Sequence, residues 1–91
     1  MNTELQKLQL RIKNLKKRKK KIVLCHGVFD LVHLGHINYF KSSKYFGDIL
    51  VVSVTKGRFV NKGFNRPYNS DDDRVNFLTS LNTIDYVVLN D

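Results

Sequence analysis

The sequence predicts an α/β fold in which three short parallel strands alternate with helices. Three apolar runs, at residues 22–25, 48–55 and 84–89, have the length of buried strands. The stretches between them carry apolar residues at helical spacing. The resulting βαβαβ order, with right-handed crossovers, is the mononucleotide-binding half of a doubly wound sheet. Ligands of such sheets lie beyond the carboxyl ends of the strands.

The first strand and helix flank a turn that contains glycine. The run Ile22-Val23-Leu24-Cys25 predicts a buried strand. The helix is expected from residue 33 or 34 to about Phe46, and Gly47 is a suitable residue to end it. Its expected apolar side consists of Ile37, Phe40 and Phe46.

The second half repeats this arrangement with a longer connection. The near-continuous apolar run from Asp48 to Thr55 is typical of a strand buried on both faces. A polar loop covers residues 56–69. Ser70 and the three aspartates after it are typical of a helix start, because acids favour the positive end of the helix dipole. The apolar face of this helix is expected to contain Val75, Phe77, Leu78 and Leu81, and the third strand to run from Ile84 to Leu89.

A basic helix precedes this domain. Residues 1–21 hold nine Lys or Arg and one Glu, so the whole net charge of +8 lies there. The seven Lys or Arg and seven Asp of residues 22–91 cancel. Leu5, Leu8, Ile12 and Leu15 form one apolar stripe of an amphipathic helix, and the six basic residues 16–21 suit a solvated helix end or linker. We therefore expect a leader helix over residues 1–20 and a domain over residues 21–91.

Several classes of protein are excluded by composition. No apolar run approaches the roughly 20 residues of a membrane span, and the N-terminus lacks the apolar core of a secretory signal. The single cysteine, Cys25, allows no internal disulfide and is expected to be a small buried residue. These features predict a cytoplasmic protein. Nucleic acid is not an expected partner, because no aromatic residues interleave with the lysines, although the leader could bind polyanions by counterion release.

Residues 27–36, Gly-Val-Phe-Asp-Leu-Val-His-Leu-Gly-His, contain the strongest functional signal. Gly27 allows a ligand to approach the backbone, and Gly35 leaves no side chain between His33 and His36, which share one face of a helical turn. The N-terminus of a helix attracts phosphate, and two imidazoles beside it can stabilise charge that builds during nucleotidyl transfer.

The residues alone leave two other interpretations of this motif. His33 and His36 could be core histidines with satisfied hydrogen bonds. They could also join His26 in a zinc site, but no acidic or cysteine fourth ligand has a suitable spacing, so no metal site is predicted.

The pattern Gly-x-Phe-Asp-x-x-His-x-Gly-His resembles the signature of the cytidylyltransferase-like nucleotidyltransferases. A second stretch, Lys62-Gly63-x-x-Arg66-Pro67 followed by Arg74 and residues 84–88, is similar to the heptose-phosphate adenylyltransferase domains of bifunctional lipopolysaccharide-precursor enzymes. The glycerol-3-phosphate and ethanolamine-phosphate cytidylyltransferases share the first motif and are the alternative within the same family. The resemblance covers residues 21–91 and implies a Rossmann-like nucleotidyltransferase fold.

The resemblance also implies an activity and a set of site residues. A nucleoside monophosphate would pass from ATP or CTP, with Mg²⁺, to a phosphorylated small molecule, a sugar phosphate in the first instance, with release of pyrophosphate. The implied catalytic residues are His33, His36, Lys62 and Arg74, and those that bind the substrate phosphate are Lys62 and Arg66. The implied nucleotide-binding residues are Gly27, Val28, Phe29, Asp30, Leu34 and Gly35. On their own chemistry, Lys62, Arg66 and Arg74 fit phosphate binding no better than they fit a solvated loop with a surface pair between Arg74 and Asp71.

Two features depart from the family pattern. Many members carry an acid where this chain has Thr55-Lys56-Gly57, and the family continues for about two strands beyond the position of Asp91. We therefore expect a domain truncated at its C-terminus, of marginal stability, with a homodimer or a partner domain covering the free side of the first strand. A non-catalytic nucleotide-binding or interaction module is the alternative from another functional class.

Overall fold

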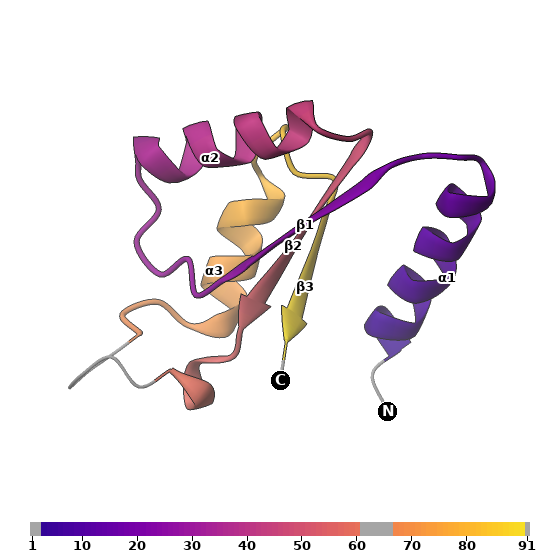
Figure 1. Ribbon diagram of the computed structural model, residues 1–91. Helices are drawn as coiled ribbons and strands as arrows, with labels where there is room; N and C mark the ends of the chain where they lie inside the picture. The colour runs from indigo at the N-terminus through magenta and orange to yellow at the C-terminus, as the bar shows by residue number, and fades with distance from the viewer. Residues whose placement is uncertain (1–2, 61–66, 91) are drawn as a thin grey trace.

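A computed structural model describes residues 3–60 and 67–90 of the chain (Figure 1). Its elements, in order, are α1 (Thr3–Lys17), β1 (Ile22–Gly27), α2 (Leu34–Tyr45), β2 (Ile49–Thr55), the short 3-10 turn η1 (Gly57–Phe59), α3 (Asp71–Thr79) and β3 (Tyr86–Asn90). The strands form one parallel sheet in the order β1-β2-β3. The predicted βαβαβ fold and its preceding helix are confirmed.

Helices α2 and α3 cover one face of the sheet, and α1 lies on the other side (Figure 1). The core is between the sheet and the α2–α3 layer, because alternate residues of β2 point into it together with one large side chain from each helix. Its buried members are Cys25, Phe40, Leu50, Val52, Val54, Leu78 and Ile84. Cys25 is a small buried core residue, as expected.

The face towards α1 is covered less completely. Leu15 of α1 is buried, and the side chain of Arg11 donates a hydrogen bond from Nε to the hydroxyl of Tyr86 on β3 over 3.0 Å. Leu24, in the middle of β1 on this face, is nevertheless 65% exposed. None of the helices in the described residues has both the length and the apolar character that crossing a membrane requires.

The structure shifts two strand boundaries by two residues each. Strand β1 extends to Gly27, because His26 and Gly27 still pair with β2. Strand β3 begins only at Tyr86. Ile84, the expected first residue, is a core residue before the strand, and Asp85 fixes this corner by exchanging hydrogen bonds with both main-chain groups of Leu50.

Two aromatic side chains lie outside the predicted apolar faces. Phe46 is 75% exposed, because it occupies the C-cap of α2 beyond the last turn that contacts the sheet. Phe77 of α3 is 49% exposed, and the buried residues of that helix are Leu78 and Arg74. An arginine therefore occupies a core position that periodicity alone gives to an apolar residue.

Candidate functional site

A tight turn leaves β1 at Gly27 and carries the chain across the carboxyl edge of the sheet. Phe29 has a φ of 52°, in the left-handed region. Its ring packs edge-on against His36, with ring centroids 5.9 Å apart, and against Phe40 at 5.2 Å. A Cβ at position 27 would come within 2.9 Å of the Phe29 ring. Glycine is required there because the turn folds the aromatic ring back over the strand end.

The two histidines of the motif cap α2. His33 is the N-cap residue, and its Nδ1 accepts a hydrogen bond of 2.9 Å from the N–H of Gly35. His36, three residues later, accepts a 3.1 Å hydrogen bond at Nδ1 from the N–H of His33. This is the reciprocal arrangement of a capping box, which is usually built from Ser or Thr and Glu or Gln. Here it is built from two imidazoles.

The cap fixes the tautomer of both rings. A neutral imidazole that accepts at Nδ1 carries its proton on Nε2. His33 and His36 therefore both present an Nε2–H donor, and their ring centroids are 4.2 Å apart. Burial, and then the neighbouring His33, lower the pKa of His36 below its usual 6.5. The neutral donor form of His36 is thus favoured near neutral pH.

Gly35 is part of the same arrangement. A Cβ at this position would lie 2.7 Å from Cε1 of His33, a distance that real Cβ contacts do not show. The glycine between the histidines makes room for the capping ring, which agrees with the role expected from the sequence.

Several main-chain donors of this turn have partners within the turn. The proposed enzyme role has the N–H groups around Val28 and Phe29 and those of residues 33–36 cradle the nucleotide. In the structure the N–H groups of His33 and Gly35 donate to the histidine rings, and that of His36 donates to the carbonyl of His33. These three are therefore occupied, and the ring Nε2–H groups are the side-chain donors that the turn can offer to an anion.

A cleft of about 310 Å³ lies beside this turn. Its lining brings together most of the predicted nucleotide-binding residues and one of the histidines. The lining residues are Gly27, Val28, Phe29, Asp30, Leu31, His36, Val60 and Pro67. His33, Leu34 and Gly35 form the capping turn next to it. Lys62 and Arg66 lie outside the described residues. Leu31, Val60 and Pro67 were not predicted as site residues, because an apolar side chain in a turn or loop carries no chemical signal.

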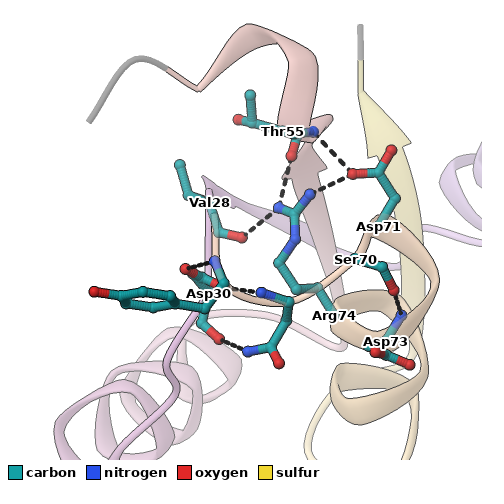
Figure 2. A network of polar contacts seen from close by, with 10 residues as sticks. Val28, Asp30, Thr55, Ser70, Asp71, Asp73 and Arg74 are labelled. Atoms are coloured by element: carbon teal, nitrogen blue, oxygen red, sulfur yellow. Dashed lines mark hydrogen bonds and ion pairs between the residues drawn. The ribbon is translucent and has the colours of Figure 1, made fainter. Parts of the chain in front are cut away.

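Asp30 ties the motif to the connection that leads into α3. Its carboxylate accepts hydrogen bonds from the N–H groups of Tyr68 at 2.6 Å and Asn69 at 2.8 Å. Its carbonyl accepts a third from the side-chain amide of Asn69, at 2.6 Å. Figure 2 shows Asp30 within this network. The aspartate therefore shapes the turn and holds the second loop against the first.

Arg74 lies beneath the same edge and is 2% exposed. Its Nη1 donates to the carbonyls of Val28, at 2.9 Å, and Thr55, at 2.7 Å, while Nη2 pairs with Asp71 (Figure 2). The same carboxylate oxygen of Asp71 accepts the N–H of Gly57 at 2.8 Å. One guanidinium thus connects the ends of β1 and β2 with the first turn of α3.

This placement changes the interpretation of Arg74. The pair with Asp71 is present, but it is not the solvated surface pair considered from the sequence, because the arginine side chain is only 1% exposed. Its Nε has no hydrogen-bond partner in the described part of the chain, and the side chain lines a second cleft of about 370 Å³. The contacts are those of a residue that positions the strand ends, and direct contact with a phosphate stays a prediction.

The described residues do not form a ready site for a metal ion. They contain no group of three or more His, Cys, Asp or Glu that could hold one. The carboxylate of Asp30, the acid nearest the motif, already accepts two main-chain N–H groups. These residues do not fit the role of a preformed Mg²⁺ cage.

Residues 24–91 match the model of the family described as cytidylyltransferase-like. The chain belongs to this family. Relatives named bifunctional protein HldE include one from a Nitratiruptor species, 42% identical over 88 residues that cover 94% of the chain and 19% of the relative. Another, from Campylobacter fetus subsp. fetus, is 45% identical over 74 residues, which cover 79% and 16%.

A solved structure has a similar fold. The lipopolysaccharide core biosynthesis protein from Thermoplasma volcanium GSS1 is similar with a TM-score of 0.73 and 35% identity, covering 79% of the chain and 59% of that protein. The chain spans about a fifth of the length of the curated relatives it matches.

Proposed function

We propose that this chain binds a nucleoside triphosphate at the His33–His36 turn and takes part in transferring its nucleoside monophosphate to a phosphorylated sugar. An oxygen of the acceptor phosphate attacks the α-phosphorus, the bond between the α- and β-phosphates breaks, and pyrophosphate leaves. No covalent enzyme intermediate is needed, so the protein contributes positioning and charge stabilisation.

The observation that carries the proposal is the orientation of the two imidazoles. Each uses Nδ1 as an acceptor within the cap, so each directs a donor Nε2–H away from it. Donors fixed in this way need no reorganisation when negative charge builds on the phosphoryl oxygens. His36 lines the cleft together with Gly27 and Val28 at the end of β1. Mg²⁺ would arrive on the triphosphate, as it usually does at nucleotide sites.

The relatives favour a sugar phosphate as the acceptor. The proteins named HldE match nearly the whole chain, and the resemblance in the sequence is to heptose-phosphate adenylyltransferase domains. Glycerol 3-phosphate is the alternative acceptor, with CTP as the nucleotide. Lys62 and Arg66 remain proposed ligands of the acceptor phosphate.

Pyrophosphate release by the purified 91-residue chain tests the proposal. ATP and CTP are each supplied with Mg²⁺ and either heptose 1-phosphate, glycerol 3-phosphate or no acceptor. We expect release to depend on the acceptor and to be greatest with ATP and heptose 1-phosphate. His36→Ala should lower it about 10²–10³-fold, whereas Tyr45→Ala, at the 87% exposed far end of α2, should not change it.

Nucleotide binding is measured in parallel by calorimetry. Binding without turnover would favour the non-catalytic module, and greater turnover with CTP and glycerol 3-phosphate would favour the alternative substrate pair. If the folded chain neither binds nor turns over either nucleotide, the proposal is wrong.

A further inference from the structure

A cluster of four polar side chains lies at the same edge of the sheet, on the opposite face. His26 of β1 has Nδ1 3.2 Å from the hydroxyl of Ser53 and Nε2 3.5 Å from the hydroxyl of Thr55, both on β2. Strand pairing places Asn90 of β3 beside Thr55. These four residues face α1, and neither the capping turn nor the Arg74 network uses their side chains.

The position of this group is unusual for a sheet face that a helix covers. Earlier in the same strands this face carries Leu24, Val51 and Val88, as packing against α1 requires. Towards the carboxyl ends it becomes polar. Ser53 is only 7% exposed and interrupts the apolar run of β2. A strand that only packed against a helix would gain stability from an apolar residue at that position.

A cleft of about 400 Å³ separates α1 from this face. That volume is within the range of small-molecule sites. Its polar lining residues are His26, Ser53 and Asn90 of the sheet and Gln9 of α1, the others are aliphatic, and no Lys, Arg, Asp or Glu of the described residues lines it. Thr55 is not one of the lining residues, but its hydroxyl lies 3.5 Å from Nε2 of His26. Imidazole, hydroxyl and amide groups both donate and accept hydrogen bonds. This chemistry matches the hydroxyl groups and C–H surface of a neutral polyol, and it does not match a phosphate.

The cleft adjoins the proposed reaction site through a single residue. Successive side chains of a strand point to opposite faces, so His26 faces α1 while Gly27 lies at the edge of the nucleotide cleft. Gly27 itself has no side chain, and the ring of Phe29 packs over it on the α2 side. A ligand that passes the end of β1 could keep its phosphate near His36 and its hydroxyl groups near His26.

We propose that His26, Ser53 and Thr55 bind the hydroxyl-bearing, uncharged part of the phosphorylated acceptor and so contribute to acceptor specificity. This inference rests on the proposed function. It assigns the two sides of the sheet edge different tasks: the α2 side holds phosphates, and the α1 side recognises the polyol.

The test is a binding measurement by calorimetry with the full chain. The probes are heptose 1-phosphate, inorganic phosphate and ATP. Ser53→Ala and Thr55→Val are combined, because each removes a hydroxyl with little change of shape. Thr79→Val, which removes the exposed hydroxyl of α3, is the matched control. Circular dichroism checks that each variant is folded.

We expect the double variant to weaken binding of heptose 1-phosphate about tenfold, the effect of losing roughly two hydrogen bonds. Its affinity for inorganic phosphate and for ATP should stay unchanged, and Thr79→Val should alter none of the three. Adding His26→Ala to the double variant should weaken binding of heptose 1-phosphate further.

The outcomes separate this inference from the proposed function. Unchanged affinity for heptose 1-phosphate in the double variant overturns the inference, as does a wild-type chain that binds this probe no more tightly than inorganic phosphate. A double variant that loses ATP affinity instead would assign the cleft to the nucleotide and also overturn it. Failure of the wild-type chain to bind ATP would count against the proposed function, while the sugar-phosphate measurement still decides the inference.

Discussion

The N–H of His33 donates a hydrogen bond to Nδ1 of His36 over 3.1 Å. The residue that caps α2 therefore also orients the imidazole that lines the nucleotide cleft. This contact links the start of α2 to the proposed chemistry. Nδ1 of His36 accepts the hydrogen bond that caps the helix, and Nε2 of the same ring therefore carries the proton that can be donated to a phosphate. The first two predictions separate these roles.

His36→Ala should lose more stability and more activity than His36→Gln. Glutamine is a usual residue at the third position of a capping box, so it can restore the hydrogen bond to His33. The alanine variant should lose about 1 kcal/mol of unfolding free energy, the typical net value of one hydrogen bond. His36→Ala should lower kcat about 10²–10³-fold, because it has no donor in place of Nε2–H. The glutamine amide also carries N–H donors, so this variant should retain more activity than the alanine variant. Equal thermal stability of the two variants would show that the cap does not need this side chain, and normal turnover of the alanine variant would show that the imidazole is structural.

The thermal stability of the domain should fall as the pH drops below 6.5, the usual pKa of histidine. The folded state lowers the pKa of His36 from 6.5, by burial first and by His33 second. Because the unfolded chain then takes up a proton that the folded chain resists, the contribution of His36 is complete above pH 6.5 and is lost as the pH falls through its folded pKa. Tm measured against pH should decline more steeply below this value for the wild type than for His36→Gln. If the Tm of the two proteins declined in parallel below pH 6.5, the lowered pKa of His36 would be contradicted.

Arg74→Lys should destabilise the domain even though it keeps the charge. A lysine cannot reach two carbonyls and a carboxylate with the planar geometry of a guanidinium. We expect a loss of about 2–4 kcal/mol in denaturant unfolding, from the hydrogen bonds to Val28, Thr55 and Asp71. Asp72→Asn, at an exposed position in the same turn of α3, is the control. If Arg74 served only as a phosphate ligand, the lysine variant would keep its stability and lose nucleotide affinity.

The apolar stripe of the leader helix should contribute to stability, and its basic end should not. Leu8 and Ile12 are half-buried on the side of α1 that faces the sheet. Changing both to Asp should lower the free energy of unfolding by about 1.5–3 kcal/mol, the amount expected for one fully buried side chain, since each of the two is half-buried.

The lysines at the end of the leader helix form a separate case, because Lys17, Lys19 and Lys20 are exposed. Changing them to Gln should leave stability and turnover unchanged and reduce only salt-dependent polyanion binding. A fall in nucleotide affinity would place this run beside the triphosphate.

Local patterns predicted the elements because each carries its own signal. The apolar run of β2, the Ser70 cap and the glycine spacing of the motif all specify their structure within a few residues. The roles of Arg74 and His26 could not be predicted in this way. The three acceptors of Arg74 come from the turn after β1, from β2 and from α3, and the partners of His26 lie 27 and 29 residues away. Such contacts depend on strand register and on which face of the sheet each side chain takes, so they became visible only in the folded chain.

The central claim is that the histidine-capped turn binds the phosphates of a nucleotide. Its most direct test is a titration of the isotope-labelled chain with ATP and Mg²⁺, followed in proton–nitrogen NMR correlation spectra. Saturable shifts should appear for the amides of residues 27–36 and for the ring Nε2 signals of His33 and His36, and His36→Ala should remove them while Tyr45→Ala should not. Shifts confined to the basic residues 16–21 that vanish with added salt, or no shifts in a folded chain, would contradict it.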